Sequence, residues 1–121
     1  MWKRYIVEFG TGADLHGMDM TKAACKAVKD AISHSCLSGI TEIIGITDPA
    51  TQMKVAIKIA APMPEKVDLE KVKAALPFGK AEIEVVSGGL NVTGLSVQAL
   101  GEGDQIVLVN AALTVYIEVE A

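Results

Sequence analysis

The sequence predicts an α+β protein, a two-layer sandwich in which two helices cover one face of a mixed or mainly antiparallel sheet. Alternating apolar and polar residues indicate several strands, and apolar residues at helical spacing indicate two helices. Half of the residues are apolar but only 4% are aromatic, so the core is expected to consist of aliphatic side chains and alanine. A chain of 121 residues suits one domain of this kind, residues 1–121.

The first two predicted elements are a strand and a long helix. The strand covers residues 3–9, where Tyr5, Val7 and Phe9 alternate with a second set, Arg4, Ile6 and Glu8. The helix covers about 20–37, with an apolar face of Met20, Ala24, Ala27, Val28, Ala31 and Ile32. Asp19 or Thr21 can cap its start and Gly39 can end it.

The later elements are shorter. We expect strands at 42–47 and 53–60, a helix at 69–76 capped by Asp68, a strand at 80–86 and a last apolar run at 105–120. That run exceeds the usual strand length, so Asn110 is expected to mark a bulge. The uncovered face of the sheet would be polar, with Lys54, Lys58, Glu82, Glu84, Thr114, Tyr116 and Glu118 on it. A homo-oligomer that closes such sheets around an axis would cover this face, and we expect a ligand site between its subunits.

The charge of the chain limits its partners. A net charge of −4 and a pI near 5.1, without a lysine or arginine cluster, argue against nucleic acid and against an anionic membrane surface. No run approaches the roughly 18 apolar residues of a membrane span, so we expect a cytoplasmic protein. Cys25 and Cys36 lie too far apart on one helix to pair, and free thiols are expected.

The stretch EFGTGADLHGMD, residues 8–19, is the first candidate site. It lacks the third glycine of a dinucleotide fingerprint and the ending of a Walker loop. Glycines that allow close backbone approach, with Asp14 and His16 near a helix N-terminus, suit an anion or carbonyl site with an acid/base group. Asp14, His16 and Asp19 would also suit a metal, with His34 from another subunit. Alternatively, the acids only cap the turn and helix.

This stretch matches the pattern GxGxDxHG through Gly10, Gly12, Asp14, His16 and Gly17. It resembles the signature of an uncharacterised family of small bacterial proteins that also has plant members, and the likeness covers the whole chain. The resemblance implies that the loop is a site. His34, near the end of the helix in AISHSC, is a second candidate, either as a ligand-binding residue or as a cap of its own helix.

A second glycine-rich loop, VVSGGLNVTG, places Ser87 at a strand end before Gly88 and Gly89, whose amides could form an oxyanion site. Lys54 and Lys58 are the candidate bases. This arrangement is similar to one module of the cyanuric acid hydrolase and barbiturase family. Those modules in turn resemble the trimeric Bacillus-type chorismate mutase, which implies a trimer-forming architecture. An alternative for Ser87 is a turn between two strands.

Together these loops give the leading functional hypothesis, hydrolysis or rearrangement of a small cyclic amide or carbonyl compound. His16 would be the general acid/base, Asp14 would orient it, and Ser87 would be a nucleophile. The amides of Gly12, Gly17, Gly88 and Gly89 would stabilise negative charge. The alternatives are a non-catalytic module that binds a metabolite or an anion, and a purely structural assembly protein. The sequence specifies neither substrate, cofactor nor metal.

Overall fold

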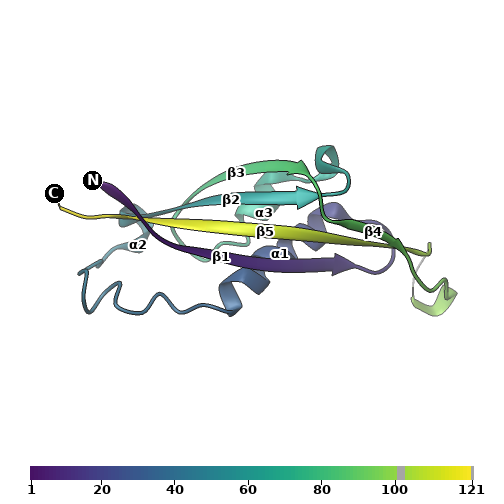
Figure 1. Ribbon diagram of the computed structural model, residues 1–121, viewed down its shortest axis with the longest axis horizontal. Coiled ribbons are helices and arrows are strands. Elements are labelled where there is room, and N and C mark those ends of the chain that lie inside the picture. The colour runs from purple at the N-terminus through teal and green to yellow at the C-terminus, as the bar shows by residue number, and fades with distance from the viewer. Residues whose placement is uncertain (101–102, 121) are drawn as a thin grey trace.

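A computed structural model describes residues 1–100 and 103–120 as a five-stranded mixed sheet with helices on one face (Figure 1). The strands are β1 (Trp2–Asp14), β2 (Met53–Ala61), β3 (Lys80–Ser87), β4 (Leu90–Thr93) and β5 (Gln105–Glu118). The helices are α1 (Met20–Ser33), α2 (Pro49–Gln52) and α3 (Leu69–Lys73), with short 3₁₀ turns η1 (Pro64–Lys66) and η2 (Gln98–Leu100). The predicted α+β class with a mixed sheet is confirmed, with α2 as an additional helix.

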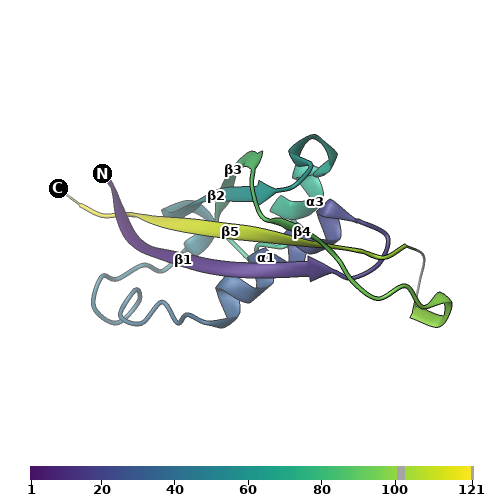
Figure 2. The same cartoon turned by 45° about the vertical axis from the view of Figure 1, so that its right-hand side comes forward.

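The long strand β5 lies at the centre of the sheet. The strand order is β1-β5-β2-β3, and β4 pairs with the part of β5 that extends beyond β2. All pairs are antiparallel except β2 with β3, which are parallel because α3 and its loops connect them. The first and last strands therefore lie side by side, with Trp2 opposite Glu118, as both views show (Figures 1 and 2).

Helix α1 covers β1 and β5 through a face of small side chains. Asp19 caps its start, because the Lys22 amide donates to Asp19 Oδ1 at 3.0 Å. Its buried residues are Met20, Ala23, Ala24, Ala27, Val28 and Ala31. The predicted apolar face is thus confirmed for all but Ile32, which is half-buried. The alanines let the helix lie close to the sheet, and α3 packs beside it through the buried Val72.

The predicted strand at 42–47 is wrong. This segment forms turns, in which the Ile43 and Ile44 amides both donate to the carbonyl of Gly39. Gly39 and Gly45 have positive φ, a conformation that breaks an extended strand. The first helix also ends earlier than predicted, at Ser33, and residues 34–48 form a long connection (Figure 1).

The expected bulge is at a different place. Asn110 pairs regularly with Thr11 on one side and Ala60 on the other, so the prediction of a bulge there is wrong. The register instead shifts in β1 between Arg4 and Ile6. After this shift, each side chain of β1 points to the opposite face from the one that strict alternation would give it. Glu8 is therefore buried under the helices, whereas Phe9 is 71% exposed on the uncovered face.

The uncovered face carries the polar residues that were predicted for it. Lys58 pairs with Glu84 at 3.4 Å, and Lys54 lies over the rings of Trp2 and Tyr116, 5.0 and 5.5 Å from their centroids. Toward β4 the same face is apolar, with exposed Val7, Phe9, Leu90 and Val92. Among the described residues, no helix is long and apolar enough to cross a membrane.

Candidate functional site

The first glycine-rich stretch is mostly strand and not loop. β1 continues to Asp14, so Gly10 and Gly12 lie inside it, facing α1. A Cβ atom on Gly10 would come within 2.2 Å of the Ala27 carbonyl oxygen, and one on Gly12 equally close to that of Ala23. This close helix-on-strand packing accounts for both glycines without a ligand. The predicted start of the loop after residue 9 is therefore wrong.

The carboxylate of Asp14 holds the turn that connects β1 to α1. Asp14 is 3% exposed, and its Oδ2 accepts a hydrogen bond of 2.8 Å from the amide of Asp19. Its Oδ1 lies 3.5 Å from Lys22 Nζ. The turn includes Gly17 and Met18, both with positive φ. Asp14 thus stabilises an irregular turn, as the capping alternative predicted.

His16 lies on the outer side of this turn. It is half-buried, and its Nδ1 is 3.3 Å from the carbonyl oxygen of Gly103. Both oxygens of Asp14 have other partners, so the expected Asp14–His16 hydrogen bond is not among the interactions of the described residues. A shallow hollow beside the ring is lined by Gly17, Met18, Gly103, Asp104 and Gln105.

Ser87 lies in β3, at the edge of the sheet opposite to β1. It pairs with Ala61 at the end of β3, which is three strands away from β1, a separation of at least about 14 Å. Lys58 pairs with Glu84 on the uncovered face of the sheet. Side chains alternate between the two faces along a strand, so Ser87, three residues after Glu84, points to the other face. Within one chain, therefore, Ser87 contacts neither His16 nor the lysines proposed as its base. A contact between chains stays a prediction.

Gly88 and Gly89 form the sharp crossing from β3 to β4. The Gly88 amide donates to the Ala61 carbonyl at 3.0 Å, so it is not free for an oxyanion. Gly89 has a φ of +69°, and a Cβ on it would come within 2.1 Å of the Leu108 carbonyl oxygen. Both glycines thus have a local role in the turn, as the alternative for this loop predicted.

His34 caps the far end of α1. Its Nε2 lies 2.8 Å from Asp30 Oδ1, and Asp30 Oδ2 accepts from the Thr11 amide at 2.8 Å. These hydrogen bonds, the one from Thr11 foremost, lower the pKa of Asp30. No group of three or more His, Cys, Asp and Glu suited to a metal occurs in residues 1–100 and 103–120. Cys25 and Cys36 are free, as predicted.

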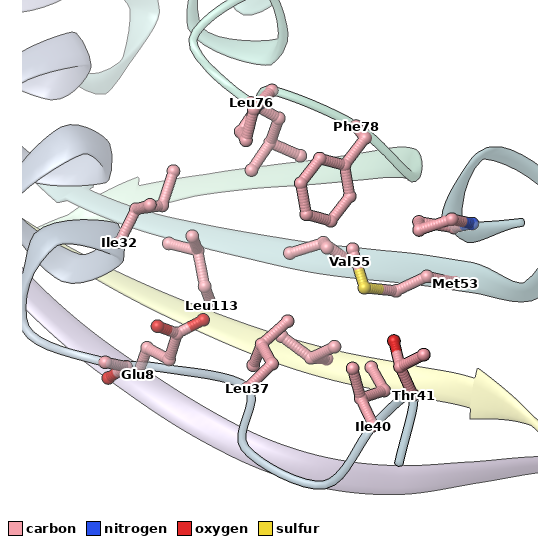
Figure 3. Close-up of a pocket in the computed structure, with 14 residues that line it drawn as sticks. Glu8, Ile32, Leu37, Ile40, Thr41, Met53, Val55, Leu76, Phe78 and Leu113 are labelled. Carbon is pink, nitrogen blue, oxygen red and sulfur yellow. The ribbon is translucent and has the colours of Figure 1, made fainter. Parts of the chain in front are cut away.

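A mainly apolar cavity surrounds a residue that the sequence pattern did not single out, Glu8. This cavity has a volume of about 340 Å³ and lies between the sheet, the end of α1 and two loops (Figure 3). It is lined by Glu8, Ile32, Ser35, Leu37, Ile40, Thr41, Pro49, Met53, Val55, Leu76, Pro77, Phe78, Leu113 and Val115. Apart from Glu8 and two hydroxyls, this lining is apolar. We call it the Glu8 cavity.

Glu8 is the one titratable group among the described residues that line the cavity. It is only 7% exposed, and Figure 3 shows its carboxylate at one end, with Thr41 and Met53 toward the other. Burial raises the pKa of Glu8, and the nearby hydroxyl of Ser35 opposes that rise in part. A carboxyl group with a raised pKa in an apolar cavity is a common feature of functional sites.

Sequence reasoning missed Glu8 because strict alternation from Tyr5 to Phe9 assigns it to the solvent side. The signal that could have found it is its spacing from the glycines. Glu8, Gly10 and Gly12 are every second residue of β1 and therefore share one face. Two glycines in a row on one face indicate that a helix packs closely against it. A charged residue in phase with two such glycines is expected to be buried.

The fold defines a small α+β protein with an open mixed sheet, and a mainly apolar cavity lies on the helix side of that sheet. A family model described as "Conserved hypothetical protein (Lin0512_fam)" matches residues 4–115, so the chain belongs to that family. This agrees with the predicted uncharacterised family. The protein is one of unknown function.

A solved structure supports the same fold. The crystal structure of an FtsZ-like protein of unknown function from Nostoc punctiforme PCC 73102 is 41% identical in sequence, with a TM-score of 0.86. The match covers 97% of this chain and 97% of that one. The comparison with curated proteins gives no match. The relatives thus establish family and fold, and the function is argued from the site.

Proposed function

We propose that the protein binds a small organic molecule in the Glu8 cavity. The observation that carries the proposal is one buried carboxylate at the end of an otherwise apolar cavity of about 340 Å³. That volume is at the small end of the range for ligand sites, and an apolar lining with few polar groups is their usual composition. A ligand would bury its apolar body among the side chains and direct its polar group toward Glu8.

One wall of the cavity belongs to the connection between α1 and α2, which supplies Leu37, Ile40 and Thr41. This connection contains no helix or strand, although the turn at Gly39 fixes its course through backbone hydrogen bonds. A loop wall against a rigid sheet wall suits entry and exit of a ligand, because a loop can open at low cost.

The proposal is tested by a substitution in this loop that fills the cavity with a larger side chain. Ile40→Trp places a large ring among the lining residues, whereas Ile43→Trp places the same ring on a side chain that is 85% exposed in the same loop. Methyl NMR spectra are recorded during titration with cyclohexylmethanol and ε-caprolactam, two neutral ring compounds. We expect shifts at Leu37, Met53 and Leu113 in the native protein and Ile43→Trp, and none in Ile40→Trp. Equal shifts in both variants would contradict the proposal.

The predicted homo-oligomer remains part of the proposal, with the uncovered sheet face as the contact between copies. Its apolar part, with Phe9 71% and Leu90 58% exposed, is the kind of surface that association covers. Its polar part carries a row of lysines on β2 beside a row of glutamates on β3. A face with both charges side by side is complementary to a copy of itself, which favours a second copy over a partner of uniform charge.

Self-association is tested by light scattering after gel filtration. Phe9→Glu places a charge in the apolar part of this face, and Ile43→Glu places the same charge on the exposed loop. We expect an oligomer for the native protein and for Ile43→Glu, and a monomer for Phe9→Glu. The measured mass also tests the predicted trimer. A native protein that runs as a monomer at high concentration would exclude this part of the proposal.

Hydrolysis or rearrangement of a cyclic amide remains the catalytic form of the proposal. It requires Ser87 of one chain to meet His16 of another, given the separation of the two within a chain. The purified oligomer is incubated with ε-caprolactam and a cyclic imide, and ring opening is followed by NMR. Turnover that disappears in both Ser87→Ala and His16→Ala would support the hypothesis. Without turnover, binding in the cavity is the function that is left.

A further inference from the structure

We propose that the ligand of the Glu8 cavity is a primary amine with a compact apolar body, bound in its protonated form by Glu8. This inference rests on the proposed function, because it names the ligand class for the same cavity. It comes from the lack of a positively charged residue beside Glu8 in the cavity lining, which is a different observation from the volume of the cavity.

The Glu8 carboxylate has no cationic partner among the described residues that surround it. The cavity lining contains no lysine, arginine or histidine. The nearby Ser35 hydroxyl lowers the pKa of Glu8 in part, and a neutral hydroxyl compensates only part of the cost of burying a negative charge. A ligand that brings a positive charge to this position would form the missing ion pair inside a largely apolar enclosure, where the interaction is strong.

The neighbouring elements supply no substitute. On α1 and the residues after it, Asp30 and His34 pair with each other, and Cys36 is exposed. On β5, the residue opposite Glu8 is Leu113. Charged residues of the other adjoining segments, Lys3, Arg4, Glu42, Asp48, Lys54, Lys73 and Lys80, are not part of the cavity lining. The charge state of Glu8 is therefore set by burial, by Ser35 and by whatever occupies the cavity.

The rest of the cavity describes the remainder of the ligand. Thr41 and Ser35 are the hydroxyl-bearing residues of the lining, and all others except Glu8 are apolar. Phe78 presents its ring to the cavity beside Val55 and Leu76 (Figure 3). An aromatic ring and aliphatic side chains suit a hydrocarbon body and tolerate a nearby ammonium group, which is attracted to the ring face. A ligand with a carboxylate or phosphate would place like charge beside Glu8 and is disfavoured.

Three probes of nearly equal shape separate the alternatives: cyclohexylmethylamine, cyclohexylmethanol and cyclohexanecarboxylate. They carry a positive, a neutral and a negative group on the same ring. Binding is measured at pH 7 by calorimetry, and by methyl NMR to locate it in the cavity. We expect the amine to bind at least about tenfold more tightly than the alcohol, because a hydrogen bond to a charged group contributes more than a neutral one. The carboxylate should bind most weakly.

Two changes then remove the charge of Glu8 while the cavity stays in place. Glu8→Gln keeps the shape and should bring amine and alcohol to equal affinity. In the native protein, lowering the pH through the raised pKa of Glu8 should weaken amine binding and leave alcohol binding unchanged. The pH titration needs no variant, so it decides the matter even if Glu8→Gln folds poorly.

The outcomes distinguish failure of the amine preference from failure of small-molecule binding itself. Equal binding of amine and alcohol to the native protein, or tightest binding of the carboxylate, would overturn the amine inference and leave small-molecule binding intact. A preference for the amine that survives in Glu8→Gln would also overturn it. If no probe shifts the methyl signals of Leu37, Met53 and Leu113, the proposed function itself fails.

Discussion

The carbonyl oxygen of Ala23 in α1 lies against the backbone of Gly12 in β1, at a place where a Cβ on Gly12 would be only 2.2 Å from it. A change of side-chain rotamer cannot relieve such a contact, because the Cβ is fixed to the β1 backbone and the oxygen belongs to the α1 backbone. Gly12→Ala should therefore push the helix from the sheet and lower the free energy of unfolding by about 3 kcal/mol. Chemical denaturation measures it. Thr11→Ala, whose side chain is on the exposed face, should change stability by less than about 1 kcal/mol.

Glu8→Gln should make the protein more stable at pH 7. Burial raises the pKa of Glu8 above its ordinary value of 4.5, so the folded state binds this proton more tightly than the unfolded chain. The stability that this proton gives is complete below pH 4.5 and is lost as the pH rises through the folded pKa. The advantage of Glu8→Gln, measured by denaturation at several pH values without ligand, should therefore vanish in acid. An advantage independent of pH would contradict this account.

Asp30→Asn should show the opposite dependence on pH. The Thr11 amide, first, and His34 lower the pKa of Asp30 below its ordinary value of 3.8. The stability that this carboxylate contributes is present above pH 3.8 and disappears as the pH falls through the folded pKa. The variant should thus be less stable than the native protein at pH 7, and the difference should decrease in acid. A difference that grows in acid would refute the assignment.

Asp14→Ala should lower stability by about 2 kcal/mol, because it leaves the Asp19 amide without its buried acceptor. Asp14→Asn should cost less, since its side-chain oxygen can still accept that hydrogen bond and only the contact with Lys22 is lost. Thermal and chemical denaturation measure both. If Asp14 acted only by orienting His16, both variants would unfold like the native protein.

The sequence predicted the class of fold and most elements because periodicity records burial directly. α1 and β2 show clear 3.6- and 2-residue patterns, Asp68 was correctly predicted as a cap, and the cap of α1 is Asp19, one of the two residues predicted for it. The segment 42–47 was misassigned because its apolar residues suit a strand as well as a loop, and only the positive φ of Gly39 and Gly45 decides between them.

The candidate site was harder to predict, since it depends on contacts between distant segments. The one-residue shift near Tyr5 cannot be read from composition, yet it moves Glu8 into the interior and Phe9 out of it. The cavity also needs Phe78, which lies 70 residues further along the chain than Glu8. By contrast, the polar residues that attracted attention, Asp14 and His34, have partners within five residues of their own position.

The central position of β5 makes the sheet depend on contacts between distant parts of the chain. β1 pairs with β5 alone, and β2 depends on it along most of its length. β1 ends at Asp14 and β5 begins at Gln105, so these two paired strands are far apart in the sequence. Without β5, α1 is the only other described element with extensive contacts to β1. The pairing of β1 with β5 therefore needs the closure of a long loop, which makes this part of the sheet slow to form compared with structure built from local contacts.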